Sequence, residues 1–157
     1  MKPPQYLLDT NACIAIRNSL RSIEPKDAVR KVGMQRFIAR WRGIAAHDLA
    51  MSFVSLGELA VWAEKHSDPP KARKLLERLK SMISVLGAAP GPEPGGAHAL
   101  AHRYAEIRTD LERRGCVIGG NDLWIAAHAA MHGMTVVTGN TSEFQRVTGL
   151  TVEDWTV

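Results

Sequence analysis

Five acidic or amide side chains lie where the sequence predicts that a strand ends or a helix begins. Asp9 follows a short apolar run, Glu58 and Asp122 lie near the start of helical patterns, and Asn140 and Glu143 follow a second apolar run. Oxygens of this kind suit Mg²⁺ or Mn²⁺, which keep several waters and bind phosphate oxygens. If these positions share one sheet edge, they predict a divalent metal site.

Electrostatics favours a bound cation at such a cluster. Like charges within a few ångströms raise the pKa of one another's carboxyl groups. A divalent ion is the simplest means of keeping Asp9, Glu58 and Asp122 ionised together at neutral pH.

Each of these acids also has a structural interpretation. Asp9 fits an Asx turn, and Asp122, beside Asn121 as a helix cap, fits the preference of acids for a first helical turn. Ser55 and Glu58 have the S-x-x-E spacing of a capping box. Only the coincidence of polar side chains at four junctions favours the metal site over these local roles.

The fourth junction is open between two residues. Asn140 offers a neutral oxygen, while Glu143 offers a charge three residues later. With Asn140 as a helix cap, Glu143 occupies the N3 position, which predicts a second capping box as the structural alternative.

Two histidine pairs have the i, i+4 spacing of zinc ligands, His98 with His102 and His128 with His132. Neither pair includes the glutamate of an HExxH motif. On a helical wheel, His128 and His132 also project away from Asp122. We therefore do not expect either pair to bind metal.

Aromatic and basic residues offer a weaker signal for nucleic acid. The four tryptophans are scattered, which favours packing over base stacking: Trp41, Trp62, Trp124 and Trp155. Five basic residues share one predicted helix with an apolar stripe: Lys71, Arg73, Lys74, Arg78 and Lys80. We interpret them as a solvated face that is also able to contact phosphates.

Hydrophobic periodicity predicts the elements that position these residues. Strands are expected at 6–8, 49–54, 84–86 and 134–138 and near Leu150, with a Gly- and Pro-rich loop at 87–96. Helices are expected at 12–18 after a cap at Thr10 or Asn11, and at 26–44, 55–65, 69–82, 97–114 and 121–132, with a short one after 140. The alternation predicts an α/β fold whose central parallel sheet has helices on both faces. Ligands in such sheets bind at the carboxyl ends of the strands.

Composition is that of one compact domain spanning residues 1–157, of which 45% are hydrophobic. Twenty Lys and Arg against 16 Asp and Glu give a net charge of +4. The pI is near 9.3, so a nucleic acid or an acidic protein is a plausible partner.

The two cysteines, Cys13 and Cys116, lie far apart and form no CxxC motif, which favours a reducing cytoplasm. No apolar run is long enough for an export signal or a membrane anchor, so we expect neither.

Four motifs resemble those of PIN-domain nucleases in their order and context. They are LLDTN at 7–11, SLGELA at 55–60, GNDLWIAAHA at 120–129 and VTGNTSEF at 137–144. The segment GLTVEDW at 149–155 resembles the end of VapC-type toxins, so the similarity covers essentially the whole chain.

The resemblance implies a magnesium site. Asp9, Glu58 and Asp122 match the first three acids of the family, and Asn11 and Thr138 match polar residues that support the site. Many PIN domains have an aspartate where this chain has Asn140, so Glu143 is the alternative fourth acid. The segment 17–50 is long for the toxin branch and has no assigned role.

The implied activity is that of an endoribonuclease using one or two Mg²⁺ ions (or Mn²⁺) and acting as the toxin of a type II toxin–antitoxin system. Such an enzyme hydrolyses RNA phosphodiesters to 5′-phosphate and 3′-hydroxyl ends. The resemblance also implies tRNA or rRNA as substrate, a cytoplasmic homodimer, and a cognate antitoxin whose C-terminal segment covers the active-site groove.

Other functions are compatible with an α/β chain of this kind. A PIN-fold DNA endonuclease would have the same composition, and an inactive α/β binding module is consistent with the missing carboxylate at Asn140. A phosphoacceptor signalling domain fits poorly, because no second acid adjoins Asp9. A DxD phosphatase also fits poorly, because Asn11 stands where its second aspartate would be.

Overall fold

The computed structural model describes residues 4–87 and 96–157, and its centre is an all-parallel sheet. The five strands lie in the order β3-β2-β1-β4-β5. They are β1 (Tyr6–Leu8), β2 (Leu49–Ser52), β3 (Ser84–Leu86), β4 (Thr135–Val137) and β5 (Val152–Glu153). Leu8 pairs with Met51 on one side and Val137 on the other, so the carboxyl ends of β1, β2 and β4 are level.

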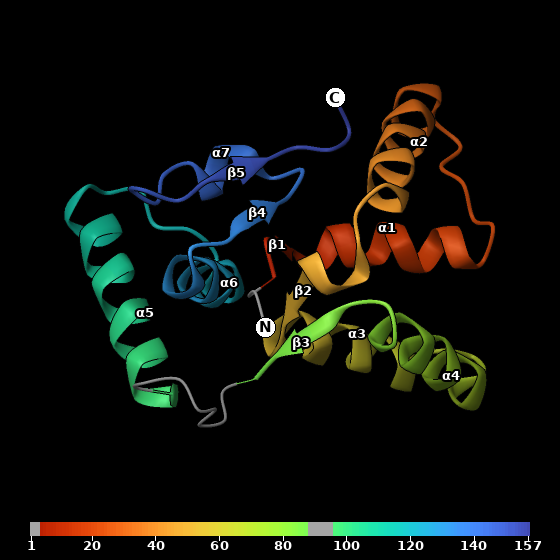
Figure 1. Ribbon diagram of the computed structural model, residues 1–157, viewed down its shortest axis with the longest axis horizontal. Helices are drawn as coiled ribbons and strands as arrows, with labels where there is room; N and C mark the ends of the chain where they lie inside the picture. The colour runs from red at the N-terminus through yellow and green to blue at the C-terminus, as the bar shows by residue number, and fades with distance from the viewer. Residues whose placement is uncertain (1–3, 88–95) are drawn as a thin grey trace.

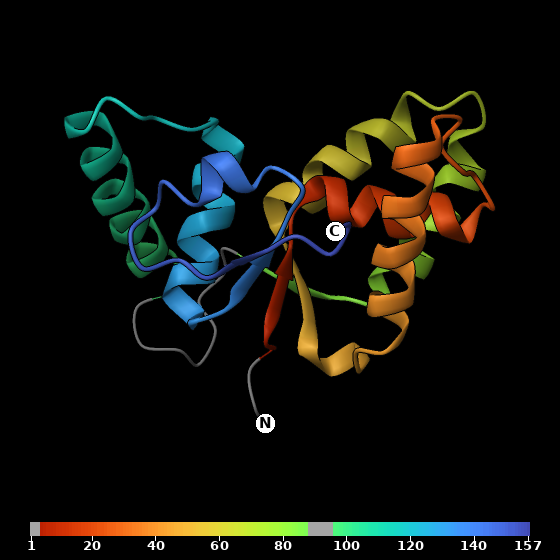
Figure 2. The same ribbon diagram turned by 90° about the horizontal axis from the view of Figure 1, so that it is seen from above.

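Helices cover both faces of the sheet, as Figures 1 and 2 show. One face carries α1 (Thr10–Leu20), α2 (Ala28–Arg42), α3 (Phe53–Glu64) and α4 (Pro69–Lys80). The other carries α5 (Gly96–Arg113), α6 (Gly120–His132) and α7 (Thr141–Phe144). A short 3-10 helix, Ala46–Asp48, leads into β2. None of the described helices is both long and apolar enough to cross a bilayer.

The central strands supply side chains to two hydrophobic cores. Successive side chains of a strand point to opposite faces. Leu8 and Met51 therefore join the core under α1 to α4, while Leu7 and Ala50 join the core under α5 and α6. Because both faces are covered, the strands read as continuous apolar runs. The predicted α/β architecture with a parallel sheet is confirmed.

The first helix begins two residues earlier than predicted. Asp9 is its cap, since the Asp9 backbone is extended and its side chain accepts a hydrogen bond from the Ala12 N–H. The prediction of Thr10 or Asn11 as the cap was wrong, because the chain turns directly from the end of β1 into α1.

The same direct turn occurs after β2. Ser52 is the cap of α3 and accepts from the Val54 N–H, so the strand ends at Ser52 and not at Val54. Ser55 is therefore buried inside α3, and the capping box predicted for Ser55 and Glu58 does not exist.

Other boundaries shift by a few residues. The cap of α6 is Gly119 and not Asn121. The last strand lies at Val152–Glu153 and not near Leu150. Of the loop predicted at 87–96, residues 88–95 lie outside the described residues.

The helix predicted at 26–44 is only partly amphipathic in the structure. Phe37, Ile38 and Trp41 of α2 are buried, but Val29 is 81% and Val32 is 47% exposed. The first half of α2 stands away from the sheet (Figure 1), and both valines line an open groove together with residues of α1 and the C-terminal tail.

Two glycines in helices test the backbone geometry. Gly133 ends α6 at φ +63°, where an L side chain is strained, and a Cβ there would touch nothing. Gly133→Ala should therefore lower the free energy of unfolding by about 1–2 kcal/mol. Gly57, inside α3, also has open space around its Cβ position. Gly57→Ala should raise stability by roughly 0.5–1 kcal/mol. Urea unfolding followed by circular dichroism measures both free energies of unfolding. A Gly133→Ala protein as stable as the unsubstituted chain would contradict the left-handed cap.

Candidate active site

Asp9 is fixed at the carboxyl edge of the sheet. Its Oδ1 accepts from the Ala12 N–H at 2.6 Å, and its Oδ2 accepts from the Thr138 hydroxyl at 2.6 Å. Its own N–H donates to the Val137 carbonyl, and the residue is only 3% exposed. Asp9 is thus the cap of α1 and, at the same time, one of the acids at this edge of the sheet.

Thr138 links two of the predicted junctions. It is buried at the end of β4, and its hydroxyl donates to Asp9 and accepts from the Asn140 N–H at 2.8 Å. The hydroxyl is therefore used both as a donor and as an acceptor, and the two hydrogen bonds fix the β4–α7 turn against Asp9.

Glu58 connects α3 with two other helices. Its Oε2 accepts from the Thr10 hydroxyl, and its Oε1 accepts from the Asn121 amide at 2.9 Å. The Glu58 side chain is exposed toward solvent and does not bond to its own helix start. These contacts bring α1, α3 and α6 together at the acidic end of the sheet.

Asp122 lies in the first turn of α6 and is partly buried. Burial raises the pKa of its carboxyl group, the charges of Glu143 and Glu58 raise it further, and the Asn140 side chain opposes the shift. Residues on α3, α6 and α7 therefore act on one carboxylate.

The pKa of Asp9 is raised to about 6, chiefly by burial. The hydrogen bonds from Thr138 and Ala12 lower it, and the nearby charge of Asp122 raises it. Asp9 and Asp122 thus carry the mutual repulsion that the sequence predicts for a cluster without a cation.

Glu143 lies on α7 and reaches α6. Its Oε2 accepts from the Gly119 N–H at 3.3 Å. Asn140 precedes α7 but its side chain makes no cap hydrogen bond. The second capping box is therefore wrong, because the Glu143 carboxylate bonds to the start of α6 and not back to Asn140.

One cavity of about 390 Å³ brings the first three acids together. Its lining residues are Asp9, Thr10, Asn11, Ile14, Arg17, Glu58, Leu59, Trp62 and Asp122. Asn140 and Glu143 are not among its lining residues.

Sequence reasoning missed Arg17 and Trp62. Thr10, Ile14 and Arg17 follow the i, i+4, i+7 spacing of one helix face, and Trp62 lies one turn after Glu58. The signal that would have found them is helical spacing: Arg17 shares a helix face with Thr10, the neighbour of Asp9, and Trp62 shares one with Glu58.

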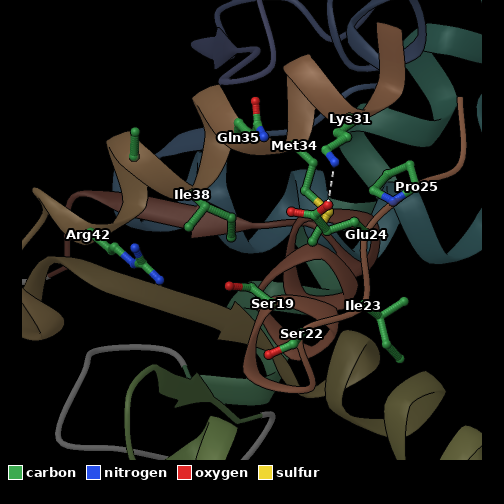
Figure 3. Close-up of a pocket in the computed structure, with 11 residues that line it drawn as sticks. Ser19, Ser22, Ile23, Glu24, Pro25, Lys31, Met34, Gln35, Ile38 and Arg42 are labelled. Carbon is green, nitrogen blue, oxygen red and sulfur yellow. Dashed lines mark ion pairs between the residues drawn. The ribbon is translucent and has the colours of Figure 1, made fainter. Parts of the chain in front are cut away.

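A second hollow lies apart from the acids, between the end of α1 and α2 (Figure 3). Its volume is about 370 Å³, and Lys31 pairs with Glu24 across it at 2.7 Å. None of the predicted site residues lines it, so it belongs to the segment 17–50 and not to the acidic cavity.

The histidines lie elsewhere. His128 is buried, and its Nδ1 lies 2.9 Å from the Ser52 hydroxyl. Burial lowers the pKa of His128 to about 4, so the ring is neutral near pH 7. His98 and His102 are exposed on α5.

The acidic cavity fits a hard divalent cation by its donor chemistry. Within residues 4–87 and 96–157, no three His, Cys, Asp or Glu side chains form a ready-made metal group. Mg²⁺ needs fewer protein ligands than that, because it commonly binds one or two carboxylates together with water and substrate phosphate. Asp9 and Asp122, with Glu58 on the same cavity, meet this requirement.

Acidic side chains gathered at the carboxyl edge of a parallel sheet stand where α/β folds bind their ligands. Residues 6–150 match the PIN domain, so this chain belongs to the PIN-domain family.

Within that family, its relatives are VapC ribonucleases. It is 35% identical to the tRNA(fMet)-specific endonuclease VapC of Shigella flexneri over 152 residues, 96% of this chain and 98% of that protein. It is 30% identical to ribonuclease VapC2 of Haemophilus influenzae, again over 96% of this chain and 98% of that protein.

Solved structures of toxin–antitoxin complexes share the fold. DNA-bound VapBC of Salmonella typhimurium has a TM-score of 0.76 and 29% identity, and covers 97% of this chain and 98% of that chain. VapBC2 of Rickettsia felis, bound to a promoter DNA fragment, has a TM-score of 0.74 and 28% identity, and covers 96% of this chain and 98% of that chain.

The raised pKa of Asp9 predicts a pH dependence of stability in metal-free buffer. Its carboxyl titrates at about 6 in the folded chain against an ordinary 3.8, so the folded state binds more protons between these values. The free energy of unfolding should therefore fall as pH rises through this window, by up to about 3 kcal/mol. Asp9→Asn should be more stable than the unsubstituted chain near pH 7 with a chelator, and this advantage should vanish near about pH 4.

Asp27→Asn is the matched control, because Asp27 is an exposed cap of α2 that accepts from the Arg30 N–H. Asn caps a helix as well as Asp does, so this change should leave stability nearly unaltered. Urea unfolding at both pH values is the measurement. An Asp9→Asn advantage that does not change with pH would refute the burial argument.

Proposed function

We propose that this chain is a Mg²⁺-dependent endoribonuclease and the toxin of a type II toxin–antitoxin module. The observation that carries the proposal is the convergence of Asp9, Glu58 and Asp122 in one cavity, in a chain whose relatives are VapC ribonucleases. We propose hydrolysis of RNA phosphodiesters to 5′-phosphate and 3′-hydroxyl ends.

We assign the metal site to Asp9 and Asp122, with Glu58 as the third acid. When bound, a divalent ion supplies an activated water and neutralises charge on the phosphate. Thr138 and the Ala12 N–H hold the Asp9 carboxylate in one orientation, which reduces the reorganisation needed at the site. Glu58, held by Thr10 and Asn121, lines the same cavity.

We assign supporting roles to two further residues. Asn11 lines the cavity from α1 and is exposed, so its amide is available to substrate or to a bound water. Thr138 acts through Asp9 and is a positioning residue. Asn140 and Glu143 are the two candidates for the fourth position, and both influence the pKa of Asp122.

We further propose a tRNA or rRNA substrate, a homodimer, and a cognate antitoxin. The name of the Shigella flexneri relative supports tRNA, and the solved VapBC complexes support an antitoxin partner. Both cysteines are free, as suits the cytoplasmic location that we propose.

The central test is cleavage of labelled tRNA with Mg²⁺ or Mn²⁺ and its loss in a chelator. Asp9→Asn and Asp122→Asn should each lower turnover roughly a hundredfold to a thousandfold without loss of the fold. Glu58→Gln should do the same, because the charge is lost while the shape is kept.

Glu64→Gln is the matched control on α3, since Glu64 pairs with Arg73 outside the cavity. It should change turnover by no more than about twofold, as expected for an exposed ion pair. Mapping of 5′-phosphate ends identifies the cleavage site. Cleavage that persists without metal would refute the mechanism, and cleavage of DNA in preference to RNA would favour the DNA endonuclease.

The fourth junction generates a separate prediction. Hard cations depend on the number of charged oxygens around them. Asn140→Asp should therefore lower the Mg²⁺ concentration for half-maximal cleavage several-fold, and Glu143→Gln should raise it. A titration unmoved by both substitutions would mean that the site has three acids.

A further inference from the structure

A basic hollow adjoins the acidic cavity. Its volume is about 500 Å³, and no Asp or Glu is among its lining residues. Its polar and aromatic lining comes from α3, from α4 and from the residues just after α1 and α3: Arg21, Trp62, His66, Lys71, Lys74 and Arg78. Trp62 also lines the acidic cavity, so the two spaces meet at this side chain.

Arg17 lies at this meeting point. It is 9% exposed, lines the acidic cavity, and stacks over the Trp62 ring with 4.0 Å between guanidinium carbon and ring centroid. Arg21 approaches the same ring at 5.9 Å. Arg17 donates to the Asn18 side chain, and no carboxylate pairs with it in the described part of the chain. A nearly buried cation without a counter-ion favours an anionic ligand.

The exposed cations of α4 divide into two groups. Lys71, Lys74 and Arg78 follow the i, i+3, i+7 spacing of one face, line the basic hollow, and have no ion pair among the residues described. Arg73 and Lys80 face elsewhere and are neutralised by Glu64 and Glu77. The unneutralised charge of α4 is therefore concentrated on the side that faces Trp62.

We propose that Arg17, Arg21, Lys71, Lys74 and Arg78 form a phosphate-binding track for the RNA strand next to the scissile bond. The proposal rests on the proposed function, because the acidic cavity must hold one phosphate of the same strand. The strand then passes over Trp62 onto α4, where the lysines and arginines contact its backbone. Such contacts set the register of the strand and are indifferent to base identity. An acidic segment of a protein partner is the competing occupant.

The test uses two charge-matched double variants of α4. K74Q/R78Q removes two cations of the track, and R73Q/K80Q removes two cations that are already paired. All four side chains are exposed, so both proteins should fold, which circular dichroism checks. Each is combined with Asp9→Asn to prevent cleavage, and binding to a fluorescein-labelled single-stranded RNA is followed by anisotropy over a range of salt.

Each lost phosphate contact lowers the salt slope by about 0.7 for a single strand. K74Q/R78Q should therefore lower the slope by about one to one and a half and weaken binding roughly tenfold at low salt. R73Q/K80Q should bind within about twofold of the parent. Equal effects of the two variants, or no effect of either, would overturn the track. Normal RNA binding by K74Q/R78Q with weakened binding of the antitoxin would assign the surface to a protein partner and also overturn it.

Cleavage assays separate this proposal from the proposed function. If the unsubstituted chain cleaves RNA while K74Q/R78Q keeps its kcat/KM, the track fails and the nuclease stands. If K74Q/R78Q loses RNA affinity as expected but the unsubstituted chain does not cleave, the track stands and the nuclease fails.

Discussion

The structure depends on holding a buried carboxylate at the carboxyl edge of a parallel sheet. Asp9 follows β1, caps α1 and accepts from Thr138, which directly follows β4, so one side chain joins three elements. The parallel pairing of the strands in level register makes this arrangement feasible, because β1, β2 and β4 all end at the same edge of the sheet. The helices that follow then begin around one point, with Glu58 and Asp122 in their first turns or close to them.

This arrangement has an electrostatic cost, because it buries carboxylates close to one another. The same repulsion favours the binding of a cation. Burial and neighbouring acids raise the pKa of both Asp9 and Asp122, so the ionised cluster is less stable than dispersed carboxylates would be. Hydrogen bonds from Thr138 and the α1 backbone offset part of the cost at Asp9. A divalent cation would offset the rest, which is the physical basis of the proposed metal-dependent hydrolysis.

Charge of opposite sign is arranged beside the acids and not among them. Arg17 stacks on Trp62 at the border of the acidic cavity, and the unpaired cations of α4 continue away from it. A net charge of +4 gives no hint of this separation, because ion pairs neutralise much of the remaining surface. In the nuclease that we propose, such a division would serve two ligands: the acids would hold the metal and the cations would contact the polyanion.

The sequence by itself determined the order of strands and helices, the parallel sheet, and the junctions at which Asp9, Glu58, Asp122 and Glu143 lie, because apolar periodicity and strand–helix alternation are local patterns. It did not determine which residue begins each helix or what each acid contacts. The S-x-x-E spacing of Ser55 and Glu58 fits a capping box at a helix start and equally fits a helix interior. Only the turn at Ser52, six residues before Glu58, decides between them. Likewise, Glu58 meets Thr10 and Asn121 across 48 and 63 residues of chain, and Trp62 meets Arg17 across two helices. Such contacts arise from the packing of helices on the sheet. Spacing shows which residues share one helix face, but not which residues of another helix they meet.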